Sequence, residues 1–208
     1  MQILHLQNSR EKWKLARLGE CLLPLFSGGR EPALASAKEA LATFSTAYQR
    51  EYLAGFRCKL GLFEEHHDDG ELISDLLALM AESRADFTLT FRTLSEVAGN
   101  PGQDDRVRSL FSNMSSYDVW APIWRKRLSR ESRTPEERVA AMKSIDPKYI
   151  PRNHRVEAAI AASEQGPFAL FEELNQVLAN PYDDQPAFEG YAALPQPDEE
   201  VSQTFCGT

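Results

Sequence analysis

The sequence predicts an all-α protein of about eight to nine helices, followed by an irregular acidic tail. Apolar residues recur at spacings of three and four along most of the 208-residue chain, which is the period of an α-helix. No segment alternates between apolar and polar residues in the way that a half-buried strand does. After residue 180, prolines and acidic residues replace this periodicity, so we expect the tail to be mostly irregular.

Two helices are expected in the N-terminal part. The first ends near residues 27–29 (Ser-Gly-Gly) and carries the apolar positions Trp13, Leu15, Leu18, Leu22 and Leu23. The second begins near Pro32, which the first turn of a helix tolerates, and runs to about Leu60, just before Gly61. It should be amphipathic, because one face gathers Leu34, Ala37, Leu41, Phe44, Tyr48 and Tyr52.

Shorter helices are expected in the middle of the chain. Residues 72–80 are apolar on more than one face, which predicts a short buried helix. Two further helices follow. The first carries the apolar positions Phe87, Phe91 and Leu94 and is stopped by residues 99–102, and the second carries Val107, Leu110, Phe111 and Met114. An aromatic stripe comes next, and it is more typical of a core than of a ligand-binding face: Trp120, Ile123, Trp124 and Leu128.

The clearest local signal is the start of a helix at Thr134. Its hydroxyl can cap the helix, Pro135 has no N–H that needs a partner, and Glu137 can reach back to the backbone of the cap. Val139, Met142 and Ile145 then face inward until Pro147. Two last helices carry the apolar positions Val156, Ala159 and Ile160, then Phe168, Phe171, Leu174 and Leu178.

The charge of the chain is unevenly distributed. Residues 1–155 hold all 23 Lys and Arg with 21 acids, whereas residues 156–208 hold ten acids and no base. The most basic stretch, residues 125–155, could bind nucleic acid. We favour a different interpretation, in which it faces the acidic end of the same chain, because a net charge of −8 repels a phosphate backbone.

Composition indicates a cytoplasmic protein with no membrane segment. No apolar run approaches the roughly 20 residues that span a bilayer, and the first residues do not resemble a secretory signal. The odd number of cysteines argues against a disulfide framework. Cys21 and Cys58 lie on apolar helical stretches and are expected to be buried, whereas Cys206, near the C-terminus, is expected to be exposed and reactive.

The sequence contains no recognisable catalytic or metal site. Neither glycine-rich phosphate loop motif occurs. Residues 86–88 (Asp-Phe-Thr) resemble a kinase metal-binding motif, but they lie inside a helical pattern and lack its glycine. Residues 66–69 (His-His-Asp-Asp) have no second ligand pair and are more typical of a solvated loop. We therefore expect no cofactor or metal in this chain.

Two polar clusters remain as candidate sites, residues 84–92 and residues 146–155. Either cluster could contact a phosphate or a partner, but we favour hydrogen-bond networks that fix helix packing. The candidate residues are Arg84, Asp86, Arg92, Arg152 and Asn153.

The same clusters belong to a series of blocks that resemble the selenoprotein O (YdiU) family, in order along the chain. The blocks are residues 13–18, 57–62, 75–80 and 84–92, Asp146-Pro147-Lys148-Tyr149-Ile150-Pro151-Arg152-Asn153, Asn180-Pro181-Tyr182-Asp183-Asp184-Gln185-Pro186, and the closing Cys206-Gly207-Thr208. On this resemblance, residues 1–12 are a divergent N-terminal segment, residues 13–180 a helical domain, and residues 181–208 a Pro-rich acidic tail.

The resemblance implies the C-terminal helical region of a kinase-like fold. Family members are pseudokinases that use ATP and Mg²⁺ to transfer AMP to protein hydroxyls, and Cys206 stands at a position associated with redox control. The nucleotide-binding and catalytic residues would lie in a part that precedes this chain, which would be inactive without that part or another chain. The alternative is a stand-alone helical interaction or regulatory module without catalysis.

Overall fold

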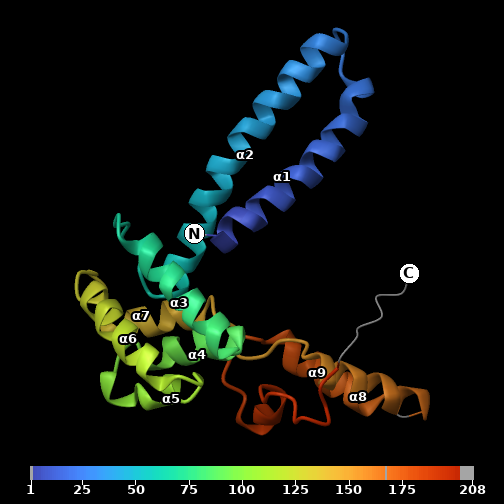
Figure 1. Ribbon diagram of the computed structural model, residues 1–208. Helices are drawn as coiled ribbons and strands as arrows, with labels where there is room; N and C mark the ends of the chain where they lie inside the picture. Colours follow the sequence, from blue (N-terminus) through green and yellow to red (C-terminus); the bar gives the residue numbers. More distant parts are fainter. Residues whose placement is uncertain (1, 167, 202–208) are drawn as a thin grey trace. The chain divides into compact units, whose positions relative to one another are not determined.

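The computed structural model describes residues 2–166 and 168–201, with the backbone alone for residues 2–11. Within these ranges the chain forms α-helices and short 3₁₀ helices and no strand, so the all-α prediction is confirmed (Figure 1). The chain divides into two compact units. The first consists of Met1–Arg57 and Glu65–Leu76, and the second of Cys58–Glu64 and Leu77–Thr208.

The first unit holds α1 (Gln2–Leu22), the 3₁₀ helix η1 (Leu23–Leu25), most of α2 (Arg30–Lys59) and the start of α3 (Asp69–Ser83). α1 and α2 run in opposite directions (Figure 1). The chain reverses at Gly28 and Gly29, whose φ angles of 97° and 93° favour glycine. The predicted long helix is confirmed by α2. Along it the rings of Phe44, Tyr48, Tyr52 and Phe56 follow one another at centroid distances of 5.6, 6.1 and 4.7 Å.

The second unit begins at the end of α2 and contains α4 (Phe87–Val97), η2 (Pro101–Gln103), α5 (Asp105–Arg108), α6 (Met114–Leu128) and α7 (Pro135–Lys143). α4 packs against α5 and α7. Four large buried side chains form an aromatic row, with centroids 5.4 to 6.1 Å apart: Phe111, Tyr117, Trp120 and Trp124. The indole N–H of Trp124 donates to the carbonyl of Leu60 at 2.9 Å, which fastens the end of α2 to this core.

The predicted core stripe of α6 is confirmed for Trp120, Trp124 and Leu128 and is wrong for Ile123, which is 55% exposed. The reason is geometric. Ile123 precedes Trp124 by one residue and therefore lies about 100° round the helix from it.

The predicted start of α7 is confirmed as a complete capping box. The Thr134 hydroxyl accepts from the Glu137 N–H at 3.2 Å, and the Glu137 carboxylate accepts from the Thr134 N–H at 3.0 Å. Each bond satisfies a backbone donor that the first helical turn leaves unpaired.

The rest of the second unit consists of α8 (Asn153–Glu164), α9 (Ala169–Ala179) and η3 (Pro186–Tyr191). α8 and α9 pack side by side (Figure 1). The tail was expected to be mostly irregular, and over its described residues it is, apart from η3. It also contributes to a small core of Tyr149, Val177 and Ala192, with Phe188 and Tyr191 beside them. Apolar residues within the acidic tail therefore hold it against α9 and the segment before α8.

Among the described residues, no helix combines the length and the apolar character that crossing a membrane requires.

Candidate functional site

Arg92, one of the five polar candidates, is at the centre of a hydrogen-bond network on the inner face of α4. Arg92 is 2% exposed. Its Nη1 donates to the carbonyls of Lys143, Asp146 and Tyr182 at 3.4, 3.1 and 2.9 Å, and its Nη2 donates to Asp184 Oδ1 at 2.8 Å. A single side chain thus joins α4 to the end of α7 and to the tail.

Asp184 is the tail's main anchor in this network. Its carboxylate also accepts from Lys143 Nζ at 3.0 Å and from Lys148 Nζ at 3.4 Å. Partial burial raises the pKa of Asp184, but the hydrogen bonds from Lys143 and Arg92 outweigh that effect and hold the pKa well below its ordinary value. Asp184 is therefore ionised at any physiological pH.

The basic stretch faces the acidic tail, as the charge distribution predicted. Lys148 Nζ donates to Glu189 as well, at 2.5 Å, and Arg155 Nη2 donates to the carbonyl of Gly190 at 2.9 Å. These contacts and those of Lys143 occupy part of the basic surface that a nucleic acid would need.

Asp146 forms a second, more deeply buried ion pair. Its carboxylate is fully buried and accepts from Lys59 Nζ at 2.7 Å. Burial raises the pKa of Asp146 to about 6, although Lys59 and Arg92 lower it. The ammonium of Lys59 also lies 5.5 Å from the Phe91 ring and 6.0 Å from the Phe87 ring, a cation–π arrangement. Asp146 can therefore change its charge at mildly acidic pH.

Asp86 and Arg152 form a bidentate pair at the N-terminal end of α4. The two bonds measure 3.0 and 3.2 Å, and Arg152 is 7% exposed. Asp86 also caps α4 by accepting from the Leu89 N–H at 2.8 Å. Partial burial raises the pKa of Asp86, but the bonds from Arg152 and Leu89 dominate, and the net pKa is lowered.

The backbone around Asp86 differs from the expectation that residues 86–88 lie inside a helix. Asp86 has extended φ and ψ angles and α4 begins only at Phe87, because the carboxylate binds the helix N-terminus instead of joining the helix. The left-handed φ of Arg84, 51°, separates this turn from α3.

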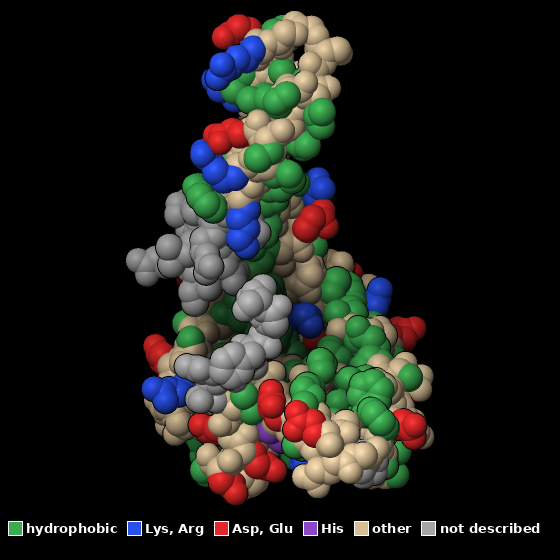
Figure 2. Space-filling view, turned by 90° about the vertical axis from the view of Figure 1, so that its right-hand side faces the viewer, with side chains coloured by type: hydrophobic (Ala, Val, Ile, Leu, Met, Phe, Trp, Pro, Cys, Tyr) green, Lys and Arg blue, Asp and Glu red, His purple; other side chains and the backbone are tan. Residues whose placement is uncertain are grey.

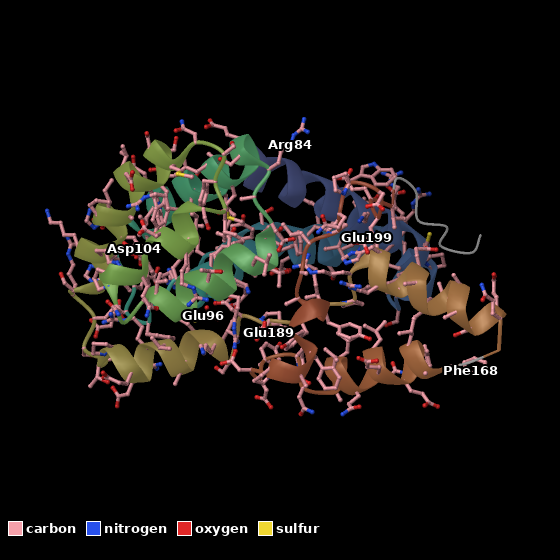
Figure 3. All side chains as sticks on the ribbon, turned by 90° about the horizontal axis from the view of Figure 1, so that it is seen from below. Arg84, Glu96, Asp104, Phe168, Glu189 and Glu199 are labelled. Atoms are coloured by element: carbon pink, nitrogen blue, oxygen red, sulfur yellow. The ribbon has the colours of Figure 1, made fainter. Side chains whose placement is uncertain are left out.

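Arg84 and Asn153 do not lie inside the network. Both are exposed, and Figure 3 shows the labelled Arg84 pointing away from the helices. The five candidates thus divide into Arg92 at the centre of the network, the separate pair of Asp86 and Arg152, and two surface residues.

Sequence reasoning missed Lys59, Lys143 and Asp184 as members of this network. Asp184 and Lys59 each lie in a block that carried the family resemblance, residues 180–186 and 57–62, and the opposite charges of residues 125–155 and the tail pointed to such pairs. Nothing local in the sequence connects these residues with Arg92.

The network holds the fold together and leaves little capacity to bind a phosphate. Arg92 already contacts three carbonyls and one carboxylate, and Arg152 contacts another carboxylate. A phosphate at either guanidinium would have to displace these acceptors. Within the described ranges, no group of three or more His, Cys, Asp and Glu side chains lies close enough together to hold a metal ion.

The cysteines are distributed differently from the expectation. Cys206, the candidate redox residue, lies outside the described residues. Cys58 is partly buried. Cys21 is exposed, so the prediction that Cys21 is buried is wrong. The apolar side chains around Cys21 on α1 are exposed too: Trp13, Leu18 and Leu22 are 63, 54 and 40% exposed.

Comparison with known proteins finds one family. The model of the family described as protein adenylyltransferase SelO matches residues 4–179. The protein nucleotidyltransferase YdiU of Nitrobacter hamburgensis is 53% identical over 197 residues, which cover 95% of this chain and 39% of the relative. The YdiU proteins of Rhodopseudomonas palustris and Rhizobium meliloti are 53% and 48% identical, and the matches cover 94% and 95% of this chain and 40% of each relative. The chain thus spans about two fifths of the length of these relatives.

Proposed function

Because this chain belongs to the SelO family of protein adenylyltransferases, we propose that it is the C-terminal helical part of an enzyme that transfers AMP from ATP to protein hydroxyl groups. The observation that carries the proposal is an identity of about half over nearly the whole chain, against relatives that are much longer. In this proposal the complete enzyme is kinase-like and binds ATP and Mg²⁺ through a segment that the longer relatives have. The chain alone is inactive.

Two properties of the described residues favour a structural role for this part of the enzyme. The buried arginines of the second unit are already occupied by carboxylates and carbonyls, as an internal packing network requires. In the first unit, α1 and η1 expose large apolar side chains, among them Trp13 at 63% and Leu25 at 79%. A helix that leaves its apolar side chains in water usually has a further polypeptide segment to cover them.

We assign Asp86, Arg92 and Arg152 the role of positioning helices and tail in this proposal. The redox role of Cys206 and the protein substrates follow from the family alone.

Calorimetric titration of the chain with ATP and Mg²⁺ tests the proposal, followed by intact mass after incubation with a hydroxyl-bearing acceptor protein. We expect no saturable binding and no AMP adduct. Addition of the segment of the Nitrobacter hamburgensis relative that lies outside the match should then restore an adduct on the acceptor.

Saturable binding of ATP by the chain alone would overturn the assignment of the nucleotide site to the other segment. Failure of every complementing segment to restore transfer, while the full-length relative is active, would favour the alternative of a stand-alone interaction module.

A further inference from the structure

The far ends of α8 and α9 form an open apolar groove of about 400 Å³ in the second unit. Buried Ala159 and half-exposed Ile160 of α8 line it together with Phe168 and Phe171, which are 58% and 49% exposed. Figure 2, in which this end of the unit faces the viewer, shows hydrophobic side chains gathered there with acidic side chains at their edge. In Figure 3 the labelled Phe168 lies at the tip of this helix pair.

The groove differs from scattered surface hydrophobics because its apolar residues are adjacent and come from two helices. Ile160 lies between two carboxylates on the same face of α8, because Glu157 precedes it by three residues and Glu164 follows it by four. Glu164 lines the groove itself. On α9, Glu172 follows Phe168 by four residues and is exposed on the same side. An apolar floor therefore lies between carboxylates on both helices.

The two helices that line the groove carry no Lys or Arg after Arg155. No Lys or Arg occurs from residue 156 to the end of the chain. Arg155, the basic residue of α8, lies in the first turn at the opposite end of the helix and bonds to the carbonyl of Gly190. The C-terminal end of α8, at the groove, adds the negative pole of the helix dipole to Glu164.

From this geometry we infer that the α8–α9 groove is a docking site for a basic amphipathic helix of a partner protein. The apolar face of such a helix covers Ile160, Phe168 and Phe171, and its Lys or Arg side chains meet Glu157, Glu164 and Glu172. Charge complementarity selects this occupant. A second copy of the chain would bring two acidic rims together, and an anionic membrane would be repelled by the same rim. The inference does not depend on AMP transfer.

Fluorescence anisotropy with two labelled synthetic peptides tests this inference directly. Both are amphipathic helices of about five turns with the same leucine pattern, one with lysine and one with glutamate on its polar face. We expect saturable binding of the leucine–lysine peptide by the full chain, at least about tenfold tighter than that of the leucine–glutamate peptide. Salt raised from about 0.05 to 0.5 M should weaken the binding.

Surface variants locate the site. Phe171→Ser and Glu164→Lys should each weaken binding of the leucine–lysine peptide about tenfold. Val119→Ser and Glu136→Lys are the matched controls, because both side chains are exposed on other helices, and they should leave the affinity unchanged. Circular dichroism melts of all four variants establish that each remains folded.

Three results would overturn the inference: equal affinity for both peptides, an affinity that Phe171→Ser leaves unchanged in a folded protein, or displacement of the peptide by a segment that complements the chain. Dimerisation that Phe171→Ser abolishes, or binding to vesicles of phosphatidylcholine and phosphatidylglycerol that requires Phe171, would assign the groove to a second copy or to a membrane instead.

Discussion

Replacement of Asp146 by Asn should change how stability depends on pH. The ordinary pKa of the carboxyl is 3.8, and burial raises it to about 6 in the folded protein. Below pH 3.8 the Asp146 carboxyl is protonated in both the folded and the unfolded state, so it does not make stability depend on pH. Above about pH 6 it is ionised in both, and the folded state then carries a buried charge. Two pKa units at about 1.4 kcal/mol each correspond to about 3 kcal/mol.

The free energy of unfolding of the parent protein, minus that of Asp146→Asn, should therefore fall by about 3 kcal/mol as pH rises from about 4 to 7. The difference should be constant above that window. Urea unfolding followed by far-UV circular dichroism, at a series of pH values and constant ionic strength, measures both curves. Subtraction cancels the titration of all groups that the two proteins share.

Lys59→Met gives an independent check of the same pair. It removes the hydrogen bond and positive charge that lower the pKa of Asp146. Measured as Lys59→Met minus Lys59→Met/Asp146→Asn, the fall should therefore extend to higher pH and become larger. Parallel curves for the parent and Asp146→Asn would refute the reasoning. A difference that grows with pH would show that Lys59 and Arg92 outweigh the desolvation of the carboxylate.

Urea unfolding tests three further positions of the second unit, Gly61, Thr134 and Arg92, the first two with a control substitution. Gly61→Ala should destabilise the protein by about 1–3 kcal/mol, because the φ angle of Gly61 is 73° and an added Cβ would lie 2.7 Å from Met142 Sδ. The control, Gly55→Ala in α2, places its Cβ in open space and should stabilise the protein by up to about 1 kcal/mol. Equal effects would contradict the steric argument. Thr134→Ala should cost about 1 kcal/mol and Thr134→Ser much less, since serine also caps helices; equal losses would mean that the hydroxyl is not what matters. Arg92→Met should cost about 3–5 kcal/mol, because it removes the donor of three backbone carbonyls and leaves Asp184 with Lys143 and Lys148 alone. A cost below about 1 kcal/mol would mean that water replaces the guanidinium.

Local features of the fold could be predicted from the sequence because local physics determines them. The capping box at Thr134 needs only four consecutive residues, and α2 follows from one apolar face and the start at Pro32. Trp124 and Leu128 were placed in the core by spacing alone.

The polar network could not be predicted in this way. Periodicity places Arg92 on a polar flank of α4, yet its guanidinium is buried because its acceptors lie 51 to 92 residues further along the chain. Spacing also misplaced Asp86 inside a helix, because periodicity does not show that the carboxylate caps α4, and nothing local points to its second partner, Arg152. A long-range partner overrides local preference at Arg92.

The bonds from Arg92 to the tail have a consequence for how the protein is made. They join residues 90 and 92 positions apart, so α4 leaves the ribosome long before Tyr182 and Asp184 do. During that interval the guanidinium of Arg92 has to stay hydrated, and α4 cannot settle fully against α7. Synthesis of residues 181–191 therefore sets the moment at which the second unit closes, and a nascent chain stalled before them would expose α4 to chaperones and proteases.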